Sequence, residues 1–434
     1  MEQTATIRDE LFAYMSKKDI TINKFAEITG VHSGTLNRVM KGEQAFAMNH
    51  LEKVTKTLGL AEDYFYEKYV VECLYTFAPT WRRIRPFIER CADLDRMDCI
   101  ERLVEGLLDD LNYAPMLFEL AEELFEQKKW QAAAILYENV ALSEKFQHSE
   151  RLALCKFRLF TINTGDDPKQ NLIQAALFEP YVDRLEEVYQ LDALKYLLNT
   201  YSALGQWDKA NQFANKMLKL AKIQYELLKK QYHQRDKSGE SNKKAVYKYI
   251  LYAELMISAI YENMGDYKTA LRLIPNYTDF SWIREKDEEA QLTIKQFQEW
   301  GKANTYLYRL QDGQIEVLEE YVEYVSTQEN EIFTALFKIV ETANRYHWNV
   351  DHIIERFSDY IPNRDYYSVF TKRNKQIQDS SYTRFQNELA KYYLTRKHID
   401  LDEISLAGAE LTATFDAGRN VIKGKLSVEF EVEF

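Results

Sequence analysis

Residues 22–42, INKFAEITGVHSGTLNRVMKG, decide the fold of the first segment, because they pattern as two short helices joined by a tight turn. The first helix is expected over 22–29 and the second over 33–40. Thr21 is suited to cap the first helix, and Gly30 supplies the residue that ends it. Apolar side chains mark the inner faces of this pair: Phe25, Ala26, Ile28, Val31, Leu36 and Val39. Ala26 must be small because the second helix crosses it closely.

Three more helices are expected around this pair, over 6–17, over 48–58 and from about residue 61. The helix over 6–17 carries one apolar face, made by Ile7, Leu11, Phe12 and Met15. The other two close the bundle with Leu51, Val54, Leu58 and Leu60. The sequence therefore predicts five short helices with an aliphatic and aromatic core.

With this pattern, about residues 5–66 resemble the phage-repressor-like, Cro-type helix-turn-helix family. That family has a small residue, a turn glycine, a hydrophobic residue, a recognition helix and a closing glycine, which here are Ala26, Gly30, Val31, 33–40 and Gly42. The family often has Gln where this chain has Ile22. The resemblance implies that the recognition helix enters the major groove of double-stranded DNA.

The resemblance also implies the contacts that this helix would make. Base edges would be read by Ser33, Gly34, Asn37 and Arg38, with His32 and Thr35 near the DNA backbone. Phosphates would be contacted by Thr21, Lys41, Gln44 and Asn49. Arginine pairs with guanine O6 and N7, and asparagine pairs with adenine N6 and N7. The alternative is a bundle that only docks or dimerises, in which case these side chains are ordinary solvated residues.

The composition favours long helices after this segment. The 434 residues include 14 Gly and 7 Pro but 30 Tyr and 23 Phe, which suits long helices joined by short turns. The net charge is −12, yet residues 1–60 carry +1, leaving −13 on the rest. The acidic body after residue 60 is a poor phosphate binder, so any DNA contact is expected in the near-neutral head before it.

Several functional classes find no support in the sequence. No stretch is apolar enough for a membrane span or a signal peptide, so we expect a cytoplasmic protein with no membrane contact. Phosphate-loop, GxSxG and HExxH patterns are absent, so we expect no catalytic residues, no cofactor and no metal. The cysteines lie in apolar helical patterns and are expected to be reduced core thiols: Cys73, Cys91, Cys99 and Cys155.

Residues 67–397 are expected to form an α-solenoid of tetratricopeptide-like helical hairpins. Three stretches match, with departures, a pattern of a large residue, a small residue, an aromatic, a turn glycine and an alanine at fixed offsets; Leu198 replaces the small residue in one stretch, and another has Lys128 in place of glycine. They are Leu197, Leu198, Tyr201, Gly205, Trp207, Ala210; Ile257, Ser258, Tyr261, Gly265, Tyr267, Ala270; and Leu120, Ala121, Leu124, Lys128, Trp130, Ala133. Degenerate hairpins would fill the intervals, over 148–165, 167–185, 287–310, 314–326, 330–348 and 380–397.

Three other segments have their own patterns. Residues 234–244 (QRDKSGESNKK) have no apolar residue and are expected to form a solvated loop. Residues 398–434 form a tail whose alternation over 426–434 predicts a β-hairpin. The cluster Trp81-Arg-Arg-Ile-Arg-Pro-Phe87 is explained either by contact with flanking DNA or by a linker helix that packs through Trp81, Ile84 and Phe87.

A helix-turn-helix head over 1–66 followed by helical repeats resembles, in domain order, the peptide-pheromone-responsive regulators of Gram-positive bacteria (the Rap, NprR, PlcR and PrgX group). That resemblance implies a short signalling peptide held on the first helices of the hairpins. The candidates for binding it are Lys195, Asn199, Ser202 and Glu262, with Leu255, Ala259, Phe118, Glu122 and Phe125 at equivalent positions. Asn199 is the preferred backbone clamp, because an amide both donates and accepts.

We therefore expect a transcriptional regulator that binds DNA as a homodimer and senses a peptide. The alternative is an interaction adaptor whose repeats bind another protein and whose head only docks or dimerises.

Overall fold

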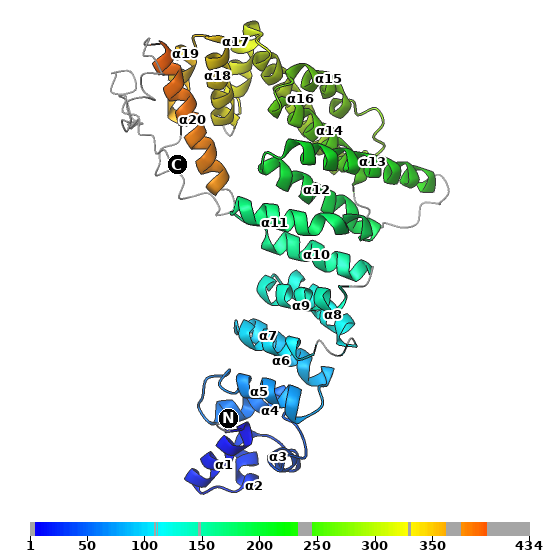
Figure 1. Ribbon diagram of the computed structural model, residues 1–434, viewed down its shortest axis with the longest axis vertical. Helices are drawn as coiled ribbons and strands as arrows, with labels where there is room; N and C mark the ends of the chain where they lie inside the picture. Colours follow the sequence, from blue (N-terminus) through cyan, green and yellow to red (C-terminus); the bar gives the residue numbers. More distant parts are fainter. Residues whose placement is uncertain are drawn as a thin grey trace. The chain divides into compact units, whose positions relative to one another are not determined.

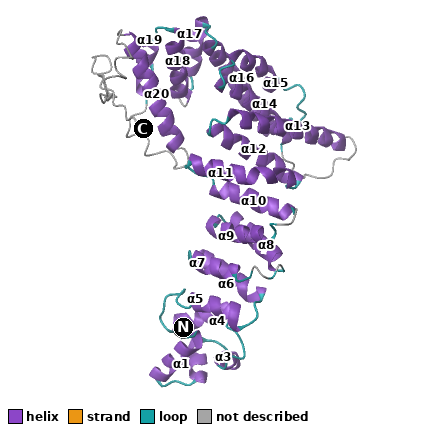
Figure 2. Ribbon diagram, in the orientation of Figure 1, coloured by secondary structure: helices purple, strands orange, loops and turns teal. Residues whose placement is uncertain are grey.

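The computed structural model describes residues 5–107, 110, 112–145, 149–232, 245–328, 331–361 and 375–396. These residues form helices and turns, with no strand among them (Figures 1 and 2), which confirms the all-α prediction. Their helices include none long and apolar enough to cross a membrane. The loop predicted over 234–244 and the hairpin predicted in the tail lie outside the described residues. The chain divides into two compact units, Met1–Thr164 with Ala176–Val188, and Gly165–Ala175 with Tyr189–Phe434.

The first unit begins with five short helices close to the predicted positions. They are α1 (Ile7–Lys18), α2 (Ile22–Thr29), α3 (Ser33–Met40), α4 (Met48–Thr57) and α5 (Tyr66–Val71). The fifth was expected from about residue 61. Instead, the chain turns there, because the amides of Tyr64 and Tyr66 bond to carbonyls only three residues back, those of Ala61 and Asp63.

Two apolar residues predicted for the inner faces are exposed. Phe12 is 46% exposed and Ile28 is 51% exposed. The buried positions of α1 are Ile7, Leu11 and Met15, which recur every four residues. Phe12 follows Leu11 and so lies about 100° farther round the helix. The prediction was wrong for Phe12 and Ile28 because the inner face of each helix is narrower than the apolar pattern suggested.

The remaining elements of the first unit share one core with this bundle. They are η1 (Glu72–Thr76, a π-helical turn), α6 (Trp81–Asp93), α7 (Met97–Glu105), α8 (Tyr113–Glu126), α9 (Trp130–Ser143), α10 (Glu150–Asn163) and η2 (Glu179–Arg184). Buried apolar side chains from Ile7 to Leu159 form a single cluster. Tyr66 and Tyr69 of α5 pack edge-on against Phe87 of α6, with ring centroids 5.1 and 5.0 Å apart. The boundary predicted between residues 66 and 67 thus falls inside a continuous core.

Helix α6 joins the bundle to the body through its apolar side. Ile84 and Phe87 are fully buried, while Arg85 bonds the carboxylates of Glu89 and Glu123 at 2.9 and 2.7 Å. These contacts support the packing interpretation of the 81–87 cluster.

All four cysteines are buried and free of disulfides, as expected. Burial raises the pKa of Cys73 to about 11, so this thiol is protonated at neutral pH.

The second unit is a succession of longer helices. Helix α11 (Pro168–Phe178) and α12 (Glu187–Ala203) each have one end in the first unit. The others are α13 (Trp207–Tyr232), α14 (Val246–Asn263), α15 (Tyr267–Thr278), α16 (Glu288–Gln311), η3 (Ile315–Val317), α17 (Leu318–Ser326), α18 (Ile332–Tyr346), α19 (Asp351–Arg356), η5 (Ser358–Tyr360) and α20 (Lys375–Arg396). Consecutive helices from α13 to α16 pack against one another, and α18 packs on α20.

The three predicted hairpins turn in the same way. Lys128, Gly205 and Gly265 have φ values of 63°, 65° and 82°, in the left-handed region. The amide that follows each of them bonds to the carbonyl five residues back, as in Gln206 to Tyr201 at 2.9 Å. This is the Schellman ending of a helix. The lysine therefore adopts the conformation that glycine adopts in the other two hairpins.

The two helices of these hairpins pack closely at the predicted alanines. Ala133, Ala210 and Ala270 are fully buried. In the α14–α15 hairpin, buried Ser258 donates its hydroxyl to the carbonyl of Ala270 at 3.0 Å. This side chain-to-backbone contact requires that α14 and α15 lie close together.

Lys128→Gly is expected to stabilise the protein, because it relieves the left-handed strain of a residue with a Cβ. The expected gain is about 1 kcal/mol, or about 3 °C in the midpoint of thermal unfolding. Gln127→Gly is the matched control, since Gln127 has a right-handed helical conformation (φ −74°) and should lose stability. If both variants lower the midpoint, Lys128 is not strained.

Candidate functional site

Helix α3 turns its apolar side inward and its polar side outward. Leu36, Val39 and Met40 are buried in the bundle. The predicted DNA-contact residues at the start and outer side of the helix remain accessible: His32, Ser33, Gly34 and Arg38 are exposed, and Thr35 and Asn37 are half-buried. The side chains of Asn37 and Arg38 make no hydrogen bond to other residues that the structure describes. The surface of α3 is therefore free within the first unit to approach a duplex.

The turn before α3 is positioned by several contacts, of which the sequence predicted the Thr21 cap, the Gly30 turn and the burial of Val31. The Thr21 hydroxyl accepts the amide of Lys24 at 3.3 Å, which caps α2. Gly30 is left-handed with a φ of 66°, and Val31 is buried beneath the turn. Lys53 of α4 donates its ammonium to the Gly30 carbonyl at 3.3 Å. These contacts fix where α3 begins.

The residues predicted to contact phosphate surround α3. Lys41 is exposed at its C-terminal cap, and Asn49 is exposed in the first turn of α4. Thr21 is exposed before α2, and Gln44 is half-buried in the loop between α3 and α4. Amides at helix starts, together with short polar side chains, are the groups that position a protein on DNA phosphates.

A buried ion pair fixes the far end of α3. Glu72 of η1 is 4% exposed, and its carboxylate lies 3.4 Å from Nη2 of Arg8. Arg8 Nε donates to the Val39 carbonyl at 2.7 Å, and this carbonyl also accepts the amide of Gly42 at 3.0 Å. Glu72 also accepts the amide of Phe46 at 2.9 Å. The pair therefore connects α1, the end of α3, the loop after it and η1.

Tyr69 supports the same loop. Its hydroxyl donates to the Phe46 carbonyl at 2.9 Å, and burial raises the pKa of Tyr69, so the proton remains available to donate. Arg8, Tyr69 and Glu72 were not predicted from the sequence as supports of α3. A usable signal was present, because Glu72 is a lone acid between Val71 and Cys73 in an apolar run.

The predicted peptide-binding residues of α12 contact the neighbouring helix α14. The Lys195 ammonium lies 5.0 Å from the ring centroid of Tyr252. The Tyr252 hydroxyl donates to Oδ1 of Asn199 at 2.6 Å. Lys195 and Asn199 are exposed, and Ser202 is half-buried. Lys195 and Asn199 are thus accessible, and each also contacts Tyr252.

Glu262 differs from them because its carboxylate is enclosed. It is 7% exposed, and its Oε1 accepts from Gln311 at 2.8 Å and from Lys338 at 2.9 Å. A ligand would have to break these bonds to reach it. In the first unit, Glu122 is similarly engaged by Arg158 of α10, at 2.7 Å. These acids link the first helices of neighbouring hairpins.

Glu72→Gln is expected to destabilise the first unit by about 3 kcal/mol, because it leaves the Arg8 guanidinium with no charged partner in a buried site. Glutamine still accepts the Phe46 amide, so the loss reports on the charge. The double variant Glu72→Gln with Arg8→Met should lose less stability than the sum of the losses in the two single variants. Urea unfolding of each variant measures these free energies.

The control for this experiment is Glu67→Gln, at an exposed acid 3.5 Å from Arg96, which should change the free energy of unfolding by less than about 0.5 kcal/mol. If the two substitutions change the free energy of unfolding equally, the Arg8–Glu72 pair stabilises the protein no more than an exposed ion pair does.

One of two comparisons with known proteins agrees with this geometry. Comparison with curated proteins gave no match. Residues 10–62 match the family of Cro/C1-type HTH DNA-binding domains. The matched segment holds α2, α3 and α4 complete, whereas Arg8 and Glu72 lie just outside it. The chain thus carries a Cro/C1-type helix-turn-helix DNA-binding domain, and a helical, repeat-like chain follows it.

Proposed function

We propose that this protein is a sequence-specific transcriptional regulator that binds operator DNA as a homodimer and whose helical body senses a short peptide. The observation that carries the DNA part is the accessible polar side of α3 within a Cro/C1-type domain. The bundle that carries α3 has a near-neutral charge on an otherwise acidic chain. This distribution favours contact with DNA through the head.

On DNA, the start of α3 would lie in the major groove. Arg38 suits a bidentate contact to guanine, and Asn37 suits one to adenine. Thr21 and Lys41 would bind phosphates and set the orientation of the helix. The Arg8–Glu72 pair would hold the other end of α3, so that the reading side chains meet the bases at a fixed depth.

Peptide sensing would use the exposed side of α12. Asn199 offers an amide to the backbone of an extended peptide, and Lys195 offers a cation. Because Tyr252 already bonds Asn199, a peptide would exchange this contact for its own. A ligand that binds one arrangement of α12 and α14 more tightly shifts the population toward it, and the change would reach DNA through the dimer.

Arg38→Ala and Asn37→Ala are each expected to weaken binding to the operator by about 1–3 kcal/mol, because each removes a base contact. Gel-shift titration on the region upstream of the protein's own gene measures this, with scrambled DNA as the reference. Binding to the scrambled DNA should change little.

Lys41→Ala is the matched comparison for these variants. Loss of a phosphate contact should weaken binding to both DNAs alike and reduce the slope of log affinity against log salt by about 1. Retardation that is equal on both DNAs and unchanged in the Asn37 and Arg38 variants would favour the adaptor, whose head only docks or dimerises.

A peptide ligand is expected to raise the thermal midpoint of the protein, because it binds only the folded state. Synthetic peptides from short reading frames beside the gene are the probes. Asn199→Ala should abolish the shift, whereas Tyr252→Phe, which removes only the internal hydroxyl, should retain it. The absence of a shift with every peptide would contradict peptide sensing and leave the DNA-binding proposal standing.

A further inference from the structure

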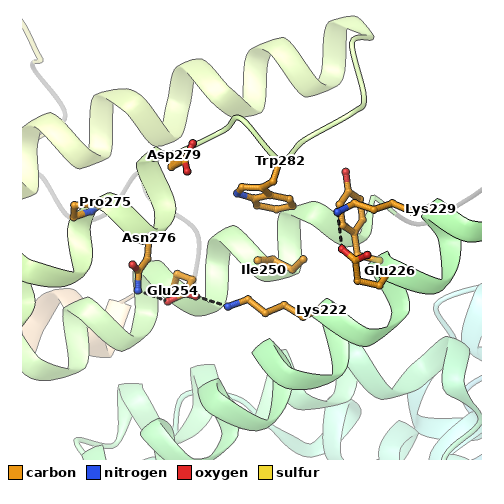
Figure 3. A pocket seen from close by; sticks show the side chains of 10 residues that line it. Lys222, Glu226, Lys229, Ile250, Glu254, Pro275, Asn276, Asp279 and Trp282 are labelled. Atoms are coloured by element: carbon orange, nitrogen blue, oxygen red, sulfur yellow. Dashed lines mark hydrogen bonds and ion pairs between the residues drawn. The ribbon is translucent and has the colours of Figure 1, made fainter.

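A cavity of about 620 Å³ lies among α13, α14, α15 and the turn that follows α15 (Figure 3). This volume is within the range of small-molecule sites. Its α14 wall is made by Ile250 and Glu254, on the side of that helix opposite Tyr252, which contacts α12. The cavity is thus separate from the residues that the sequence predicted for a peptide.

The walls of the cavity are held in place by polar contacts to one buried acid. Glu254 is 7% exposed, and its two carboxylate oxygens accept from Lys222 at 2.9 Å and from Asn276 at 3.0 Å. These bonds join α13, α14 and α15 behind the cavity. The site is therefore formed without a ligand.

The turn after α15 is fixed as well. The Tyr225 hydroxyl donates to Glu285 at 2.8 Å and accepts the amide of Arg284 at 3.2 Å. The Trp282 ring packs edge-on with the Tyr225 ring, at a centroid distance of 5.3 Å and an angle of 86°. An aromatic side chain is thus held at the cavity wall.

The charges that line the cavity leave one carboxylate in excess. The lining has three acids, Glu226, Glu254 and Asp279, and two lysines. Both lysines are already engaged: Lys222 with Glu254, and Lys229 with Glu226 at 2.6 Å and with the Tyr225 ring at 4.6 Å. The acid that remains available is Asp279.

Asp279 is exposed and ionised at the cavity rim. Among the described residues its carboxylate accepts hydrogen bonds only from Ser281, whose amide lies at 3.0 Å. The hydrogen bonds from the Ser281 side chain and amide lower the pKa of Asp279. In Figure 3, Asp279 and Trp282 line the same side of the cavity, across from Lys222 and Glu254. A negative charge and an aromatic ring on one wall form a receptor for a cation.

We propose that this cavity binds a small organic cation, an ammonium or amidinium group on an apolar body. The cationic group lies between the Asp279 carboxylate and the Trp282 ring, and the apolar body contacts Ile250 and Pro275. Because binding can be measured on the full-length chain without DNA or peptide, the proposal stands apart from the proposed function.

Three probes of nearly equal size but different charge test it: the cation benzamidine, the neutral benzamide and the anion benzoate. Isothermal titration calorimetry should show benzamidine binding about tenfold more tightly than neutral benzamide, with benzoate weakest. Asp279→Asn should remove the preference for benzamidine over benzamide. Asparagine keeps an acceptor for the Ser281 amide, so the fold of the turn is retained.

Trp282→Leu should weaken benzamidine binding about threefold or more. Glu299→Gln, at an exposed acid of α16 outside the cavity lining, is the control and should leave all three affinities unchanged. The proposal is overturned if benzamide or benzoate binds as tightly as benzamidine, if Asp279→Asn and Trp282→Leu leave benzamidine binding unaltered, or if benzamidine does not bind at about 10 mM.

Discussion

The hairpins α8–α9, α12–α13 and α14–α15 depend on one backbone arrangement, a left-handed residue after the last helical turn, followed by an amide that bonds back across five residues. It satisfies carbonyls that the helix end leaves open and reverses the chain within very few residues. Glycine adopts it at 205 and 265, but Lys128 adopts it with a side chain, as do Asp19, Asp95 and His347 elsewhere in the described part of the chain. Packing around these turns must therefore offset the strain at those four positions.

The DNA-binding head is held together by polar contacts between its helices. At the C-terminal end of α3, the Val39 carbonyl accepts from Arg8 as well as from the amide of Gly42. Arg8 in turn is held by Glu72, which lies outside the matched DNA-binding segment. The geometry of the recognition helix is thus determined partly by η1, an element of the helical body. A domain cut at the boundary predicted from sequence would lose this acid.

Local sequence rules predicted the elements well because the signals are local. Thr21 and Gly30 lie where caps and turns belong, and the bounds of α2 and α3 agree with the prediction to the residue. Phe12 and Ile28 were misplaced because an apolar residue beside the inner face has the same hydropathy as one on it. The contacts of Glu72, Glu262 and Asn199 join helices distant in sequence, and no periodicity specifies such partners. The cavity beside Trp282 is likewise a product of tertiary packing.

Because the core is continuous from α1 to α10, no flexible linker separates the recognition helix from the first helices of the body. If the proposed homodimer is assembled through this first unit, the two recognition helices are held at a fixed angle to each other. One base pair inserted at the operator centre rotates one half of the site by about 35° relative to the other. A DNA-binding domain on a flexible linker could follow that rotation, whereas one that shares its core with the following helices cannot. The operator would have to match the protein in helical phase as well as in base sequence.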